Sequence, residues 1–287
     1  MDVILSFILK YTHPLTQRSI VQICPQTWLI SICQRAQTQK DFYITQGVLR
    51  LSTHLGVQRG CGIRPSRPAM QDYAYKRLDP AVVRVPRVYR FFIDHLTERP
   101  LPDGYLFMDY IPGKTLEKLD ATATENNCAS KALMERIANI VVHLQGIKAE
   151  AVSTSPGPVD GGMPHGYLWG DYGAKRVFHS VSDMNSWLNE RLEVIGRSID
   201  LSPCYPLVLC HGDLVRRNII VMEDDDGDEE GKGAGGFDGR RIALVDWGHA
   251  ALLPRVFEIA AMSCYNDRTN YAYARELEEV TREAIGD

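Results

Sequence analysis

The chain has 287 residues, of which 45% are hydrophobic, 24% charged and 9% aromatic. These fractions lie close to the averages of globular proteins and exclude wholesale disorder, collagen-like repeats and a coiled-coil rod. The formal net charge of -4 argues against a general nucleic-acid binder, which needs a basic surface. The charge is unevenly distributed, because residues 223–238 contain eight acids and one lysine and leave the remaining chain mildly basic.

The cysteines and the apolar segments indicate a compartment. None of the seven cysteines forms a CxxC pair, which favours reduced thiols and a cytoplasmic protein. No run of about 18 apolar residues is present, so we expect no membrane span. Residues 1–15 contain an apolar patch, but an acid at position 2 and the lack of a basic start argue against a secretory signal.

The first half of the chain predicts a small sheet. Residues 1–46 show no sustained hydrophobic period, and we treat them as a poorly defined N-terminal extension. From Gly47 the pattern predicts two short strands within 48–58, a helix over 68–78 and an apolar strand over 105–111.

The second half predicts helices followed by strands. One helix begins near Ser130, and a second amphipathic helix begins near Asp183. Three apolar strands follow, at 207–210, 219–222 and 241–247. The acidic, glycine-rich stretch between the last two strands predicts a flexible insertion over 223–240.

Polar residues at the ends of these late strands form the most informative pattern. Asp213 and Asn218 lie in one short loop between apolar strands, and Asp246 ends the next strand. Carboxylate and amide oxygens suit Mg²⁺, which binds through one or two carboxylates together with substrate phosphates. Phosphoryl transfer needs such a metal and a carboxylate that accepts the proton of the attacking hydroxyl.

The same residues carry a resemblance to a known family. The segment HGDLVRRN (211–218) resembles the HxDxxxxN catalytic loop of aminoglycoside phosphotransferases and choline kinases. The segment VDWG (245–248) resembles their metal-binding segment, and YLFMDYIPGKTL (105–116) resembles the inter-lobe hinge of fungal aminoglycoside-phosphotransferase-like proteins. The resemblance spans roughly residues 47–265.

This resemblance implies a fold and a set of roles. The fold would be α+β and protein-kinase-like, with a small sheet-based lobe with hinge over 47–111 and a larger, mostly helical lobe over 112–287. Asp213 would be the catalytic base, and Asn218 and Asp246 would bind Mg²⁺. The backbone of Asp109 to Ile111 would bind the adenine of ATP. The structural alternatives are a solvated loop carboxylate for the base, a turn-stabilising amide, and a strand-end cap.

One part of the family pattern is missing. Related proteins hold the nucleotide phosphates with a strand lysine that pairs with a helix glutamate. The matching stretch GVQRG (56–60) has Gln58 in place of the lysine, and the glutamate would fall near Arg67. Arg59 is the nearest replacement cation, although adjacent strand residues point to opposite faces, and Lys76 is a poorer one.

Other residues near the motif have weaker interpretations. His211 is expected to organise the catalytic loop. Arg216 and Arg217 are interpreted as surface arginines, with contact to phosphate or substrate as the alternative. The segment GPVDGGMPHG (157–166) either lines the acceptor site or forms an ordinary surface loop.

Three functions therefore remain open. The first is an ATP-dependent phosphotransferase that acts on a hydroxyl of an unidentified small molecule, with no nucleic-acid or membrane partner and an undetermined oligomeric state. The second is a pseudokinase that binds nucleotide or a protein partner, because the lysine and glutamate are absent. The third and most distant is a metal hydrolase built on His211 and Asp213, for which the sequence offers no further ligands at sensible spacing.

Overall fold

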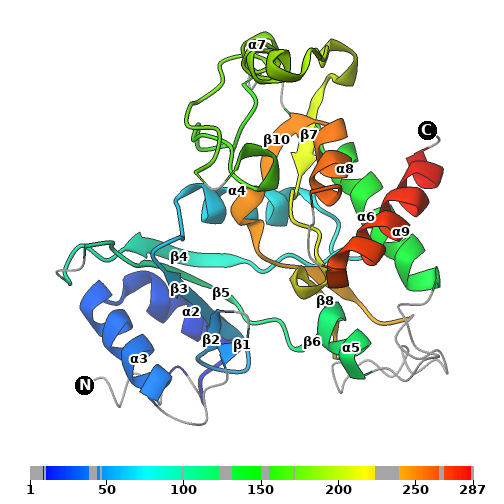
Figure 1. Cartoon of the computed structure of the whole chain (residues 1–287). Coiled ribbons are helices and arrows are strands. Elements are labelled where there is room, and N and C mark those ends of the chain that lie inside the picture. Colours follow the sequence, from blue (N-terminus) through cyan, green and yellow to red (C-terminus); the bar gives the residue numbers. More distant parts are fainter. Residues whose placement is uncertain are drawn as a thin grey trace.

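The computed structural model shows two lobes joined by a short connection (Figure 1). It describes residues 9, 11–38, 44–45, 47–97, 100–122, 131–149, 155–170, 172–223, 239–264 and 268–285. The predicted acidic insertion therefore lies almost entirely outside the described residues. Within them, the two-lobed, protein-kinase-like α+β fold that the resemblance implied is confirmed.

The small lobe is built on a five-stranded antiparallel sheet with the order β1-β2-β3-β5-β4. Its strands are β1 (Ile44–Thr45), β2 (Val48–Arg50), β3 (Leu55–Gly60), β4 (Val88–Ile93) and β5 (Gly104–Asp109). Strand β5 is buried over nearly all of its length because β3 and β4 flank it on both sides. It ends at Asp109, where the chain crosses to the large lobe.

Two helices from the N-terminal segment cover this sheet. Helix α2 (Pro14–Ile23) starts with a proline at its first position, and α3 (Gln26–Thr38) starts directly after Pro25. Buried side chains of both helices, such as Val21 and Leu29, share a hydrophobic cluster with the sheet residues Val57 and Phe107. Pro25 separates the two helices, so each has its own short apolar side, and the sequence shows no sustained period across the segment.

Helix α4 (Ser66–Arg77) lies between the lobes. It corresponds to the helix predicted over 68–78, but it begins two residues earlier and ends one residue earlier. Met70 and Ala74 on its inner side belong to the hydrophobic core of the large lobe. Gln71 points to the other lobe, where its amide donates hydrogen bonds to the Pro86 carbonyl and the Met108 sulfur. The helix therefore contacts both lobes at the level of the hinge.

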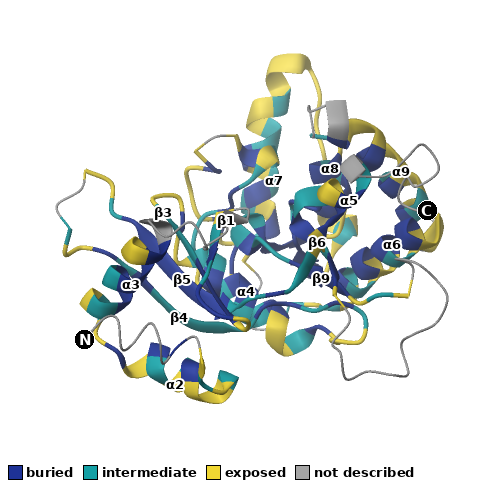
Figure 2. Ribbon diagram, turned by 90° about the horizontal axis from the view of Figure 1, so that it is seen from below, coloured by how far each residue is buried: buried dark blue, intermediate teal, exposed yellow. Residues whose placement is uncertain are grey.

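The large lobe combines helices with two small sheets. Its helices are α5 (Leu116–Thr122), α6 (Lys131–Gly146), α7 (Val181–Leu192), α8 (Val256–Met262) and α9 (Arg268–Ile285). Strands β6 (Gly113–Thr115), β8 (Ile219–Met222) and β9 (Ile242–Leu244) form one antiparallel sheet, and β7 (Leu207–Cys210) pairs with β10 (Ala251–Pro254). Figure 2 shows the buried residues concentrated in the central strands and on the inner faces of the helices.

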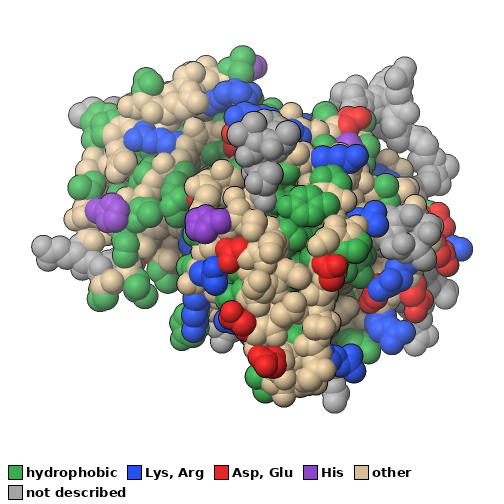
Figure 3. All heavy atoms as spheres, turned by 90° about the horizontal axis from the view of Figure 1, so that it is seen from above, with side chains coloured by type: hydrophobic (Ala, Val, Ile, Leu, Met, Phe, Trp, Pro, Cys, Tyr) green, Lys and Arg blue, Asp and Glu red, His purple; other side chains and the backbone are tan. Residues whose placement is uncertain are grey.

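The surface mixes charges of both signs. On the face shown in Figure 3, basic and acidic side chains alternate over the large lobe and do not gather into a region of one sign. Within the described residues, no helix has both the length and the hydropathy that crossing a membrane requires.

Candidate active site

The predicted catalytic loop connects two buried strands. Strand β7 ends at Cys210, a single helical turn covers Arg216–Asn218, and β8 follows immediately. Gly212 adopts a positive φ of 71°, and a side chain there would lie 3.0 Å from the carbonyl oxygen of His249. The loop therefore packs closely against the turn that follows Asp246.

Asp213 is buried in this loop, with only 4% of its surface exposed. Its Oδ2 accepts hydrogen bonds from Asn218 at 2.9 Å and from Arg217 at 3.3 Å. Its Oδ1 is also buried and has no hydrogen-bond partner among the described residues. Burial raises the pKa of the carboxyl group, while His249 and Arg217 lower it. An orphaned carboxylate oxygen of this kind is suited to accept a proton from a bound hydroxyl group.

Asn218 is oriented by Asp213. Its Nδ2 donates to the Asp213 carboxylate and to the Asp213 carbonyl, so both amide hydrogens are used within the loop. The side-chain oxygen is the atom that remains for a cation, and Asn218 lines the cleft described below. The solvated-loop alternative for Asp213 does not fit this burial, whereas Asn218 does stabilise the turn as the structural alternative proposed.

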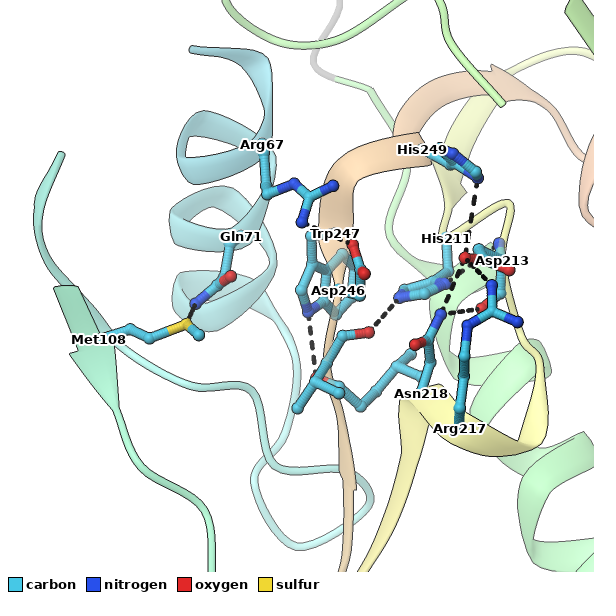
Figure 4. Close-up of polar contacts among 12 residues, drawn as sticks. Arg67, Gln71, Met108, His211, Asp213, Arg217, Asn218, Asp246, Trp247 and His249 are labelled. Atoms are coloured by element: carbon cyan, nitrogen blue, oxygen red, sulfur yellow. Dashed lines mark hydrogen bonds and ion pairs between the residues drawn. The ribbon is translucent and has the colours of Figure 1, made fainter. Parts of the chain in front are cut away.

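Two buried residues, His211 and Glu258, hold the loop in place. His211 contacts the Val245 carbonyl through Nε2 at 3.1 Å (Figure 4), and its Nδ1 accepts the Asp213 N–H at 3.3 Å. Burial lowers the pKa of His211 to about 4, so the ring is neutral at pH 7. The Glu258 carboxylate accepts the backbone N–H groups of His211 and Gly212. These contacts agree with the loop-organising role expected for His211.

Asp246 lies at the end of β9, in a left-handed backbone conformation with φ 63° and ψ 69°. Its Oδ1 forms an ion pair at 3.0 Å with Nη1 of Arg67, which projects from α4 toward the turn after Asp246 (Figure 4). The family pattern has a glutamate near position 67, and the sequence of this chain already showed that it is absent. The structure instead brings a cation to the predicted metal-binding carboxylate.

A cleft between the lobes contains most of the predicted nucleotide residues. Asp109 and Ile111 line this cleft together with Asn218 and Asp246. The Asp109 N–H donates to Arg87 and the Tyr110 N–H donates to His54, which leaves the Ile111 N–H as the candidate donor for a base. The Asp109 carboxylate accepts the Arg87 N–H at 3.0 Å, so its side chain supports the hinge.

The structure does not bring Arg59 into this cleft. Gln58 lines the cleft from β3, as the alternation of strand residues predicts. Arg59 points to the other face, where its Nη2 lies 2.9 Å from the Asp103 carboxylate and its guanidinium stacks on Tyr105. No shift of register occurs in β3, which pairs continuously with β5, so the geometry does not support a phosphate contact by Arg59.

A second group of residues surrounds Asp213 on the side of the 157–166 segment. The Tyr167 hydroxyl lies 3.2 Å from Nη2 of Arg217, and the Tyr167 ring meets His249 edge-on. His249 Nδ1 is buried without a hydrogen-bond partner among the described residues and lies 3.8 Å from Asp213 Oδ2. Arg217 is thus a partly exposed surface arginine that also contacts the predicted base. Arg216 pairs with Asp120 at 2.9 Å and has only 14% of its side chain exposed, so its interpretation as a solvated surface arginine is wrong.

The donor set of Asn218 and Asp246 fits Mg²⁺. The Asp246 carboxylate and the Asn218 amide oxygen are hard oxygen ligands of the kind that this ion prefers, and Asn218 has already committed its amide hydrogens elsewhere. Among the described residues, no three His, Cys, Asp or Glu side chains cluster as metal ligands, so the hydrolase alternative gains no support.

Sequence reasoning missed Arg67, Tyr167 and His249 as members of the site. His249 follows the VDWG segment directly, and this proximity was a usable signal. Arg67 and Tyr167 come from distant segments, and only the packing of α4 and of the turn at 167–169 against the large lobe brings them in.

Comparison with known proteins identifies the family of this chain. A sequence profile described as the phosphotransferase enzyme family matches residues 64–285. No match was found among curated proteins.

Similar solved structures include aminoglycoside phosphotransferase APH(4)-Ia, with 14% identity and a TM-score of 0.49 over 89% of this chain and 80% of that chain. A streptomycin–ATP complex of APH(2″)-IIa has 14% identity and a TM-score of 0.45 over 91% and 83% of the two chains. Spectinomycin phosphotransferase APH(9)-Ia, in complex with ADP and spectinomycin, has 11% identity and a TM-score of 0.45 over 84% and 70%.

Proposed function

Because the chain belongs to the phosphotransferase enzyme family, we propose that it transfers the γ-phosphoryl group of ATP to a hydroxyl group of a small molecule. The observation that carries the proposal is the buried Asp213 carboxylate, which Asn218 orients and whose Oδ1 has no partner among the described residues. This carboxylate lies in the same loop as Asn218, which lines the cleft between the lobes.

In this proposal the nucleotide lies along the cleft with its base at the hinge. The Ile111 N–H and the Asp109 carbonyl bind the adenine, and the phosphates extend toward Asn218 and Asp246. These two residues hold Mg²⁺, which supplies charge neutralisation of the phosphate oxygens. Apolar residues such as Val48, Met108 and Ile220 line the cleft and give the base an apolar surround.

The chemical step follows from the position of Asp213. The acceptor oxygen forms a bond with the γ-phosphorus while the bond to the β–γ bridging oxygen breaks, and the hydroxyl proton moves to Asp213. Arg217 and the Asn218 amide stabilise the ionised form of the carboxylate and oppose the burial that raises its pKa. Tyr167 and His249 border the base and are the residues that an acceptor would meet.

A catalytically impaired pseudokinase is the second candidate, and the observation in its favour is Gln58. This neutral amide lines the cleft where related enzymes have a lysine. Such a protein would bind nucleotide, or a protein partner, without turning ATP over.

One experiment separates the two candidates. We would measure ADP release by the purified chain with and without Mg²⁺ across a panel of small hydroxyl compounds, with Asp213→Asn as the matched control. Mg²⁺-dependent and acceptor-dependent ADP release that disappears in the variant supports the transferase. Nucleotide binding without acceptor-dependent turnover supports the pseudokinase, and turnover retained by Asp213→Asn overturns the role of the base.

A further inference from the structure

The ion pair between Arg67 and Asp246 places a cation directly beside a residue that lines the cleft. Nη1 of Arg67 lies 3.0 Å from Asp246 Oδ1, and only 16% of the arginine side chain is exposed. Nε of Arg67 is buried and has no hydrogen-bond partner among the described residues. The guanidinium group is thus held beside a predicted metal ligand and has a donor left over.

Gly248 makes room for this guanidinium group. A Cβ atom built on Gly248 would lie 2.3 Å from Nη2 and 2.7 Å from both Nε and Cζ of Arg67. Gly248 does not have a positive φ, so its backbone alone does not require glycine. The missing side chain at position 248 therefore lets the arginine approach the turn closely and reach Asp246.

Other cations near the small lobe are engaged elsewhere. Arg59 pairs with Asp103 on the opposite face of the sheet, and Lys76 pairs with Asp72 on the exposed side of α4. Arg77 stacks on the ring of Tyr73. Lys118 lines the cleft together with Asp246 and is the other cation that the test must compare with Arg67.

We propose that Arg67 is the residue that contacts the β- and γ-phosphates of the nucleotide, in the role that Gln58 cannot fill. The inference rests on the proposed nucleotide site. Asp246 lines the cleft, and Nη1 of Arg67 lies 3.0 Å from its carboxylate, so phosphate groups that bind in the cleft beside Asp246 are within reach of this cation. A guanidinium group also contacts two phosphate oxygens at once, which an amide does not do.

The test compares the binding of ADP with the binding of adenosine, which has no phosphates. Calorimetry on the full chain would use wild type, Arg67→Met and the matched control Lys76→Met, with and without Mg²⁺. We expect Arg67→Met to lose about 10- to 100-fold in ADP affinity and to keep its adenosine affinity. Lys76→Met should retain both affinities.

A second variant tests the role of Gly248 without removing a charge. Gly248→Ala should displace the guanidinium group and weaken ADP binding, but it should add no further loss, within about twofold, when Arg67 is already methionine. A further loss in the double variant would mean that Gly248 acts independently of Arg67, and this would overturn the spatial argument.

The outcomes distinguish this inference from the proposed function. If wild type binds neither adenosine nor ADP, the nucleotide site itself is wrong. If wild type binds both and Arg67→Met binds ADP equally well, only the role of Arg67 is overturned. Tighter Mg²⁺-dependent ADP binding by Arg67→Met would also overturn it, because the arginine would then compete with the metal for Asp246. Lys118→Met is measured alongside, and a loss of ADP affinity in Lys118→Met but not in Arg67→Met would assign the phosphate contact to Lys118 and overturn the role of Arg67.

Discussion

Asn218 gives both hydrogens of its side-chain amide to Asp213, one to the carboxylate at 2.9 Å and one to the main-chain carbonyl at 3.0 Å. The two residues are therefore a single unit, in which the amide fixes the direction of the carboxylate and its own oxygen at the same time. Removing either residue disturbs both the base and the oxygen that is available to a cation.

We expect Asn218→Ala to reduce kcat by about 100-fold or more, since the carboxylate loses its orienting donor and the cation loses a ligand. Adenosine binding at the hinge should not change. Steady-state kinetics and calorimetry would measure the two effects, with Asn189→Ala on the exposed surface of α7 as the control. Unchanged kcat in Asn218→Ala would contradict the unit described here.

The motif residues were predictable because the chain itself keeps them together. Asp213 and Asn218 share one loop, and the apolar strands on either side fix the ends of that loop. Asp246 ends a strand that pairs with β8, so the same sheet carries it to the same place. The sequence pattern is sufficient to predict a site wherever residues that meet in space are also close along the chain or lie on paired strands.

Arg67 shows where this reasoning ends. Its charge alone gave no sign of its partner, because the contact depends on how α4 packs between the lobes and on the space left by Gly248. Helices α2 and α3 were missed for a related reason. Each is a short helix that starts beside a proline, and its apolar side is defined only by the sheet that it covers.

Arg217 gives a prediction about pH. Its guanidinium group lies 3.3 Å from Asp213 and lowers the pKa of that carboxyl group, which burial raises. The ionised form is the base, so activity is lost as the pH falls through this pKa. Arg217→Met removes the cation, and the acidic limb of kcat/KM should therefore move to higher pH.

The neighbouring Arg216→Met variant is the control for this measurement, since Arg216 pairs with Asp120. Because 40% of the Arg217 side chain is exposed, added salt should reduce the difference between wild type and Arg217→Met. A shift of the acidic limb to lower pH would show that Arg217 does not act on the base.

Glu258 predicts how stability depends on pH. Burial raises the pKa of this carboxyl group from 4.5 to about 7 in the folded protein. Between pH 4.5 and 7 the folded state binds a proton at Glu258 that the unfolded state has lost. The contribution of Glu258 to the free energy of unfolding is therefore complete below pH 4.5 and is lost as the pH rises to 7. Its full size is about 3 kcal/mol.

Urea unfolding of wild type and Glu258→Gln at pH 5, 6 and 7 would test this. The stability of wild type relative to the variant should fall across the series. In the variant, the effect of His211 on the free energy of unfolding remains. Burial lowers the pKa of His211 to about 4, so its stabilising contribution is present above pH 6.5 and is lost as the pH falls to 4. Stability of Glu258→Gln should therefore rise with pH between 4 and 6.5, and a wild-type advantage that grows toward pH 7 would contradict the assignment.

Gln58 offers the sharpest prediction about the small lobe, because it already lines the cleft from β3. Gln58→Lys places a cation at the position that the family pattern reserves for one, on the same face of the strand. If Arg67 has taken over the phosphate contact, the new lysine should restore ADP binding to Arg67→Met by about tenfold or more. It should leave adenosine binding unchanged, because adenosine has no phosphate to contact.

Arg59→Lys, on the opposite face of the same strand, is the control and should restore no ADP binding to Arg67→Met. Failure of Gln58→Lys to rescue ADP binding would mean that the phosphates do not pass beneath β3, and the alignment of this strand with the lysine strand of the family would then be wrong.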